Sequence, residues 1–95
     1  MNINNYKKYI LEETMMGPNC VRLLKELFDK YPLQLTSDDL VLDLGCGTGL
    51  SSLVIAKETG AKVYANDLWV SAEDNKKRFA EWKIDVQVIP ICEDA

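Results

Sequence analysis

The sequence contains no histidine, only three cysteines, and no apolar run long enough to span a bilayer. Without histidine, the widely spaced Cys20, Cys46 and Cys92 disfavour a zinc site, so no metal is expected. An odd number of scattered cysteines instead predicts three reduced thiols in a cytoplasmic protein. The first ten residues, MNINNYKKYI, lack the apolar core of a signal peptide, and no contact with a membrane is expected.

The sequence also lacks an excess of positive charge. Its formal net charge is −4, and its basic residues form no stripe, which disfavours a nucleic acid as partner. With 95 residues, 47% of them hydrophobic and 27% charged, the chain has the composition of one small soluble domain.

The most informative stretch that is present is VLDLGCGTGLSS, residues 41–52. An apolar run leads into Gly45, Gly47 and Gly49, and a helical pattern follows at once. Glycine allows a tight turn and a close approach of a ligand to the backbone, and the first turn of a helix offers unpaired N–H groups. This order of strand, glycine loop and helix predicts a ligand-binding loop.

Apolar spacing, glycine and proline predict an alternation of helices and strands around this loop. Proline at the first helical position would start a helix at Gly17-Pro18, and Ser71 with Asp74 resembles a capping box. The second strand is mostly apolar, as expected for a strand covered on both faces. The expected elements are helix 17–31, strand 40–44, helix 50–58 with Gly60 as its C-cap, strand 61–66, helix 72–82 with Phe79 and Trp82 inward, and strand 86–91.

This alternation predicts an α/β protein with a Rossmann-like parallel sheet and flanking helices. If each new strand is added on the same side, the strand order is 3-2-1, and Pro90 then lies on an edge strand, where proline is tolerated. Residues 17–95 would form one βαβαβ unit preceded by a helix. Residues 1–16 would form an N-terminal arm or helix packed on this unit, or alternatively a flap over a substrate site, with Tyr6 and Tyr9 as candidate substrate contacts.

Ligands bind such sheets at the carboxyl ends of the strands, where several chemically notable residues are expected together. Asp43 could orient the glycine loop or hold an ammonium group. Asp67, about twenty residues beyond the loop, could accept from both hydroxyls of a ribose, and Leu68 and Trp69 could flank a base. The acid at Asp94, with Ala95, could recognise an adenine. The plainer alternatives are a tight turn at the glycines, a turn or cap role for Asp67 and a solvated chain end.

The spacing of the glycines separates two nucleoside cofactors. A dinucleotide-binding loop, G-x-G-x-x-G, needs a glycine at position 50, but that residue is Leu50 and the third glycine is Gly49. The D-x-G-x-G-x-G form resembles the first motif of the class I S-adenosylmethionine-dependent methyltransferases. AKVYANDL and VQVIPICEDA are similar to their second and third motifs, so the resemblance covers roughly residues 40–95. TMMGPNC and DLWVSAEDN further resemble the type-11 group of these enzymes, which act on small molecules.

The resemblance implies S-adenosylmethionine as cofactor, a small-molecule methyl acceptor, and a role for each matching residue. Asp43 and the loop would position the methionine part, Asp67 would hold the ribose, and Asp94 with Ala95 would hold the adenine. No residue is identified as a catalytic base. The full set of expected cofactor-binding residues is Asp43, Gly45, Cys46, Gly47, Gly49, Asp67, Leu68, Asp94 and Ala95.

The resemblance also implies a sheet of about seven strands, of which this chain supplies three. The chain would then be the cofactor-binding N-terminal part of an incomplete fold, with little or no transferase activity alone. Its first strand would keep an open edge, through which the chain could self-associate. Two other functions remain open: a non-catalytic nucleoside-binding or assembly module, and a fragment of an NAD-dependent oxidoreductase, which Leu50 disfavours.

Overall fold

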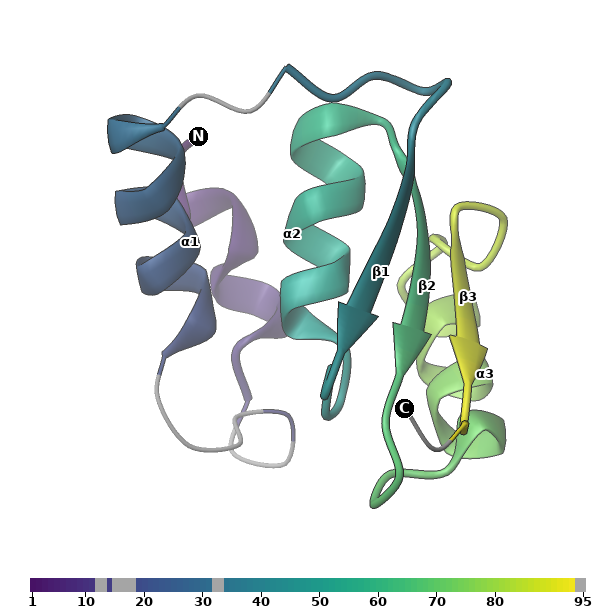
Figure 1. Ribbon diagram of the computed structural model, residues 1–95. Helices are drawn as coiled ribbons and strands as arrows, with labels where there is room; N and C mark the ends of the chain where they lie inside the picture. The colour runs from purple at the N-terminus through teal and green to yellow at the C-terminus, as the bar shows by residue number, and fades with distance from the viewer. Residues whose placement is uncertain (12–13, 15–18, 32–33, 94–95) are drawn as a thin grey trace.

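The computed structural model of the protein describes residues 1–11, 14, 19–31 and 34–93 (Figure 1). None of the helices in these ranges combines the length and the apolar character that crossing a membrane would need. The elements follow one another as a 3-10 helix η1 (Ile3–Tyr9), α1 (Cys20–Lys30), β1 (Leu40–Leu44), α2 (Leu50–Thr59), β2 (Lys62–Asn66), α3 (Ala72–Glu81) and β3 (Val88–Ile91).

The three strands form one parallel sheet in the order β1-β2-β3, with β2 in the centre. Leu42 of β1 lies opposite Tyr64 of β2, which lies opposite Ile89 of β3. This arrangement confirms the predicted parallel sheet with order 3-2-1. Pro90 lies on the edge strand β3. Proline is tolerated on an edge strand, because the outer side of such a strand needs no backbone hydrogen bond to a neighbouring strand.

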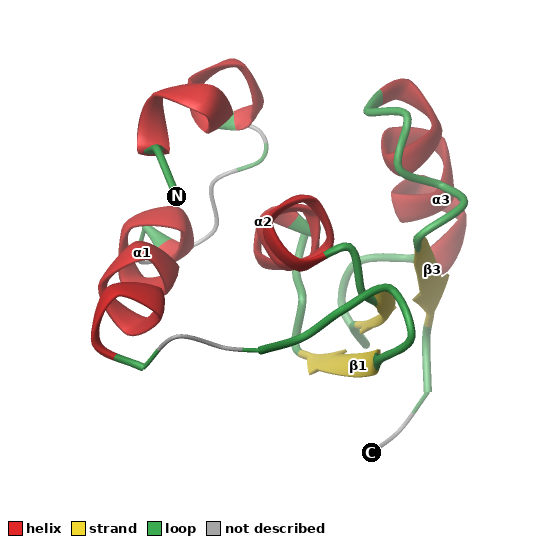
Figure 2. Cartoon of the chain, turned by 90° about the horizontal axis from the view of Figure 1, so that it is seen from above, coloured by secondary structure: helices red, strands yellow, loops and turns green. Residues whose placement is uncertain are grey.

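The helices lie on one side of this sheet (Figure 2). Both crossovers step across the sheet in the same direction, and right-handed connections of that kind place α2 and α3 on the same face. Among the described residues, no helix covers the other face, and Leu40, Leu42 and Leu44 of β1 are exposed there. The described helices thus cover only one face of the second strand, which was expected to be covered on both: Val63 is fully buried, whereas Lys62 is exposed and Tyr64 is partly buried.

Helix boundaries follow local signals. Asn19 is the N-cap of α1, and its side chain accepts from the N–H of Arg22 at 3.2 Å. The described helix thus begins at Cys20, whereas the predicted start at Gly17-Pro18 lies outside the described residues. At α3, Ser71 accepts from the N–H of Asp74 at 3.1 Å, which is one half of the predicted capping box.

The C-terminus of α2 is formed as predicted. Gly60 adopts a φ of 78°, and its N–H donates to the carbonyl of Ala56 at 2.9 Å. A left-handed residue at this position pairs one of the final carbonyls of the helix. The helix therefore ends in a short turn that leads directly into the buried Ala61 and β2.

The core lies between the helices and the sheet and includes the start of the chain. Tyr6 and Tyr9 of η1 are buried, and the Tyr6 hydroxyl donates to the Glu58 carboxylate on α2. The Tyr9 ring meets Trp82 edge to face, with centroids 5.4 Å apart. Trp82 is partly buried and Phe79 fully buried, so both point inward as predicted. The N-terminal segment is thus part of the hydrophobic core.

Candidate functional site

The loop between β1 and α2 is anchored to the end of β2. The N–H groups of Gly45 and Cys46 both donate to the carbonyl of Asn66, at 2.8 and 3.0 Å. The N–H of Gly49 donates back to the carbonyl of Cys46 at 2.9 Å. These bonds close a tight turn at the carboxyl end of the central strand, which is the end of a parallel sheet where ligands bind.

The three glycines of this loop all have positive φ angles, but their surroundings differ. A side chain at Gly45 would meet nothing within 4 Å, whereas a methyl group at Gly49 would lie 2.3 Å from the Phe79 ring. The N–H of Gly47 donates to the Asp67 carboxylate at 2.8 Å. Gly45 therefore faces open space, and Gly47 is hydrogen-bonded to Asp67, which follows β2. Gly49 allows α3 to pack closely against the loop.

Asp43 reaches from β1 to the first turn of α2. Its Oδ2 accepts from the hydroxyls of Ser51 and Ser52, at 2.6 and 2.7 Å. The carboxylate thereby fixes the entry of α2 relative to the sheet. Sequence reasoning predicted an orienting role for Asp43 but missed both serines, although their position directly after the loop was a usable signal.

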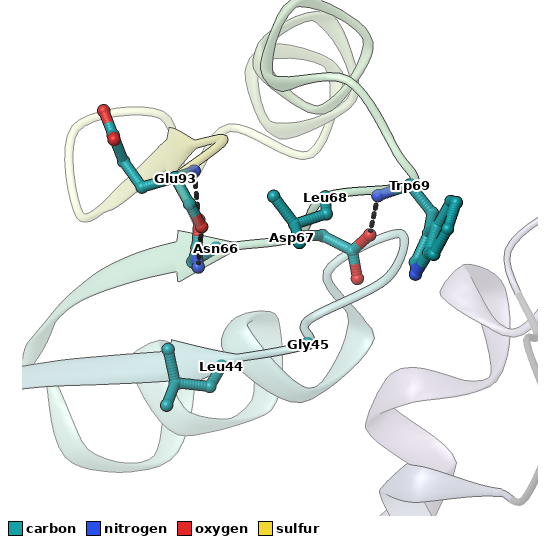
Figure 3. Close-up of a pocket in the computed structure, with 7 residues that line it drawn as sticks. All are labelled: Leu44, Gly45, Asn66, Asp67, Leu68, Trp69 and Glu93. Atoms are coloured by element: carbon teal, nitrogen blue, oxygen red, sulfur yellow. Dashed lines mark hydrogen bonds between the residues drawn. The ribbon is translucent and has the colours of Figure 1, made fainter. Parts of the chain in front are cut away.

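Asp67 follows β2, and its carboxylate accepts three backbone hydrogen bonds. Oδ1 accepts from the N–H of Trp69 at 2.7 Å (Figure 3) and from that of Val70 at 3.0 Å, and Oδ2 accepts from Gly47. Burial alone would raise the pKa of this carboxyl. The three N–H donors outweigh that effect and hold the pKa below its usual value. Asp67 is therefore a fixed carboxylate that joins the glycine loop to the turn after β2.

A cavity of about 170 Å³ opens beside this carboxylate (Figure 3). We call it the strand-end cavity. Leu68 and Trp69 on its wall are 53% and 92% exposed, so apolar surface is available to a ligand there. Its lining residues are Leu44, Gly45, Asn66, Asp67, Leu68, Trp69 and Glu93.

Asn66 ties the third strand to this cavity. Its Nδ2 donates to the carbonyl of Glu93 at 2.9 Å, and its Oδ1 accepts from the N–H of Glu93 at 2.8 Å (Figure 3). This paired contact sets the path of the chain just before Asp94 and Ala95. Those two predicted residues lie outside the described residues. Sequence reasoning missed Asn66, although a polar residue that ends an apolar strand is a recognisable signal.

A second cavity, of about 210 Å³, is lined mainly by the glycine loop and the first turn of α2. We call it the loop cavity. It shares Gly45 and Asp67 with the strand-end cavity, so the two adjoin around the same pair of residues. The lining residues are Thr14, Cys20, Gly45, Cys46, Gly47, Thr48, Leu50, Ser51 and Asp67.

Thr14 is a further residue that sequence reasoning missed. It is buried, and its carbonyl accepts from the Thr48 hydroxyl, which links the N-terminal segment to the glycine loop. Tyr6 and Tyr9, the candidate substrate contacts, line neither cavity, because both rings are buried in the core. Gly49 also lines neither cavity.

The thiols of the site are held in their neutral form. Burial raises the pKa of Cys46 to about 12, and the charges of Asp43 and Asp67 act in the same direction. Burial also raises the pKa of Cys20. A neutral thiol is a poor nucleophile and a poor metal ligand, so Cys46 contributes to the site through shape and its backbone. In the part of the chain that the structure describes, no group of three side chains could hold a metal ion.

Comparisons of the whole chain with known proteins concern its fold. Neither the family models nor the curated proteins contain a match to the chain. Among solved structures, the chain is similar to geranyl diphosphate C-methyltransferase from Streptomyces coelicolor A3(2), bound to Mg²⁺, geranyl-S-thiolodiphosphate and S-adenosyl-L-homocysteine. The identity is 26% and the TM-score 0.65 over 77% of this chain and 27% of that one.

Two other matches extend the comparison. A geranyl diphosphate methyltransferase in complex with SAM is 27% identical, with a TM-score of 0.66 over 77% of this chain and 29% of that one. The protein YjhP from Escherichia coli is 19% identical, with a TM-score of 0.61 over 98% of this chain and 36% of that one. The chain thus has the Rossmann-like fold of methyltransferases and spans roughly a third or less of the matched structures.

Proposed function

We propose that this chain binds S-adenosylmethionine and forms the cofactor-binding part of a methyltransferase that acts on a small molecule. The observation that carries the proposal is the meeting of two cavities at Gly45 and Asp67, at the carboxyl ends of β1 and β2. A long ligand with a nucleoside at one end and an amino acid at the other fits two adjoining cavities. The structures bound to S-adenosyl-L-homocysteine and SAM that the chain matches support this choice of ligand.

The nucleoside end fits the strand-end cavity. A carboxylate has about four acceptor positions, and Asp67 uses three of them for backbone N–H groups. The remaining position can accept from a ribose hydroxyl, while the apolar surfaces of Leu68 and Trp69 can flank the base. Asp94 and Ala95 follow Glu93 in the chain, and we assign them to the adenine.

The amino-acid end fits the loop cavity. Leu50 and Ser51, in the first turn of α2, line this cavity, and the N-cap Gly49 supplies no side-chain hydrogen bond to that turn. Free N–H groups at a helix N-terminus favour a carboxylate. Asp43 supports this arrangement by fixing the same turn through two hydroxyls. Gly45 leaves the space between the two cavities open.

The cofactor supplies an activated methyl group, and the role of the chain is to hold it in a fixed orientation. In methyl transfer the main task of the protein is to align the acceptor with that group. The described residues around the two cavities include no histidine and no thiol with a lowered pKa. We therefore assign to these residues binding and orientation, and not proton transfer. We expect the 95-residue chain to show little transferase activity by itself.

Isothermal titration calorimetry with the chain tests the proposal directly. We expect heat of binding with S-adenosylmethionine and S-adenosylhomocysteine, and none with NAD, which serves as the control for a general nucleoside site. A Gly45→Val variant should abolish binding, because its side chain would occupy the open space between the cavities. Binding of NAD alone would indicate an oxidoreductase. Absence of heat with both sulfur ligands, also in the longest protein that the gene encodes, would overturn the proposal.

A further inference from the structure

Asn75, on α3, is a buried amide whose two polar atoms are both used next to the glycine loop. The side chain is 1% exposed, and its Nδ2 donates to the carbonyl of Gly47 at 3.0 Å. Its Oδ1 accepts from the Arg78 guanidinium, whose Nη1 also donates to the carbonyl of Thr48 at 3.5 Å. Two successive carbonyls of the loop are therefore held by one helix.

The same part of the loop is held from two other directions. The N–H of Gly47 donates to Asp67 after β2, and the Thr48 hydroxyl donates to the carbonyl of Thr14 in the N-terminal segment. Because a peptide group is planar and trans, the bond from Asn75 to the Gly47 carbonyl makes the N–H of Thr48 point away from Asn75. The orientation of the Gly47–Thr48 peptide is thus set by Asn75.

We infer that Asn75, backed by Arg78, is a positioning residue that fixes the Gly47–Thr48 peptide of the loop in the orientation that binds the cofactor. Gly47 and Thr48 both line the loop cavity, so a rotated peptide would change the groups that a ligand meets there. The inference rests on the proposed function for its ligand. The hydrogen bonds that hold the loop, however, can be tested without any ligand.

Cys46 provides that independent signal. Its Sγ lies 3.8 Å from Nδ2 of Asn75 and 3.5 Å from the carbonyl of Gly47, and the residue is buried. Because Cys46 is only 6% exposed, its thiol should react slowly with an alkylating agent while the loop is closed and faster when the loop opens. Release of the Gly47 carbonyl should therefore raise the alkylation rate at Cys46, while the exposed Cys92 serves as the internal reference.

The test compares three variants by calorimetry with S-adenosylhomocysteine and by mass-spectrometric mapping of iodoacetamide alkylation. Asn75→Asp keeps the shape and the acceptor for Arg78 but cannot donate to Gly47. We expect its affinity to fall about tenfold, because the released Gly47–Thr48 peptide spends only a small fraction of the time in the orientation that binds. The rate of alkylation at Cys46 should rise with no change at Cys92. Arg78→Met should act in the same direction more weakly, and the exposed Lys76→Ala, also on α3, should match the wild type.

The outcomes separate this inference from the proposed function. Unchanged affinity and unchanged Cys46 alkylation in Asn75→Asp and Arg78→Met would overturn the inference. Weaker binding with a lower unfolding temperature but an unchanged Cys46 rate would also overturn it, because the loss would then be one of general stability. If the wild type binds neither sulfur ligand, the proposed function fails, and the Cys46 rates still decide whether Asn75 holds the loop. Should Asn75→Asp fail to fold, Arg78→Met provides both measurements.

Discussion

At Gly49, glycine is required by packing as well as by backbone conformation. Its φ is 94°, and a Cβ there would lie 2.3 Å from Cε1 of Phe79, whose ring is fully buried. Gly45 has a similar φ of 72°, but a Cβ there would have no neighbour within 4 Å. The two residues thus separate the cost of a left-handed conformation from the cost of overpacking.

We expect Gly49→Ala to lower the free energy of unfolding by about 2 to 4 kcal/mol, from strain and overpacking together. Gly45→Ala is the matched control and should lose only the strain component, about 1 to 2 kcal/mol. Urea unfolding followed by circular dichroism measures both values. Equal losses in the two variants would show that the Phe79 ring moves aside at little cost.

At the residue scale, the sequence singled out several residues that form the hydrogen bonds around the loop, but not all of their partners. Asp43, Gly47 and Asp67 were recognisable because their residue types and spacing follow from the loop itself. Asn75 was not, since it meets Gly47 only after α3 has packed against the loop. A single sequence carries no direct signal for a hydrogen bond between residues 28 positions apart, such as that between Asn75 and Gly47.

At the scale of elements, the start of the chain is joined to α2 through Glu58, which contacts the Tyr6 hydroxyl and lies 3.8 Å from the N-terminal ammonium of Met1. Tyr6 of η1 is 2% exposed, and its hydroxyl donates to the Glu58 carboxylate near the end of α2. Neighbouring Tyr9 packs on Trp82. These contacts place η1 against α2 and α3, and with them the segment that leads to Thr14.

We expect Tyr6→Phe to lower the free energy of unfolding by about 1 to 2 kcal/mol, because it removes a hydrogen bond to a charged group and keeps the ring. The carboxylate of Glu58 remains partly exposed and can be hydrated, which limits the loss. Tyr31→Phe, at a tyrosine that is 68% exposed, is the control and should change stability very little. Thermal or urea unfolding of both variants gives the comparison, and equal losses would contradict the role of the Glu58 contact.

The strands and central helices were predictable to within two residues because each has its own local signal. An apolar run followed by glycine marks β1, Gly60 ends α2, and Ser71 begins α3. The N-terminal segment was harder to predict, because its apolar residues are few and the 3-10 geometry of η1 gives no 3.6-residue period. Its place in the core depends on Tyr6 and Tyr9 meeting α2 and α3, which are distant in sequence.

At the scale of the whole molecule, the described helices cover one face of the sheet and leave the other open. Leu40, Leu42 and Leu44 are each more than half exposed, on the face that no described helix covers. In the described chain, β1 also pairs only with β2, so its other edge presents unpaired backbone groups. An apolar face next to an open edge favours association between copies of the chain. A second copy can bury the apolar side chains and pair the free backbone groups of the edge.

We therefore expect the 95-residue chain to self-associate through this surface, and Leu42→Lys to weaken the association. Burial of a leucine side chain contributes about 2 kcal/mol, so the dissociation constant should rise by at least about tenfold. Sedimentation velocity over a range of protein concentrations measures the change.

Val86→Lys is the matched control, since Val86 is 84% exposed but lies outside the strands. The association of this variant should equal that of the wild type. If the wild type sediments as a monomer at every concentration, or if both variants weaken association equally, β1 is not the contact surface. Calorimetry on Leu42→Lys should still detect S-adenosylhomocysteine, because Leu42 lines neither the strand-end cavity nor the loop cavity.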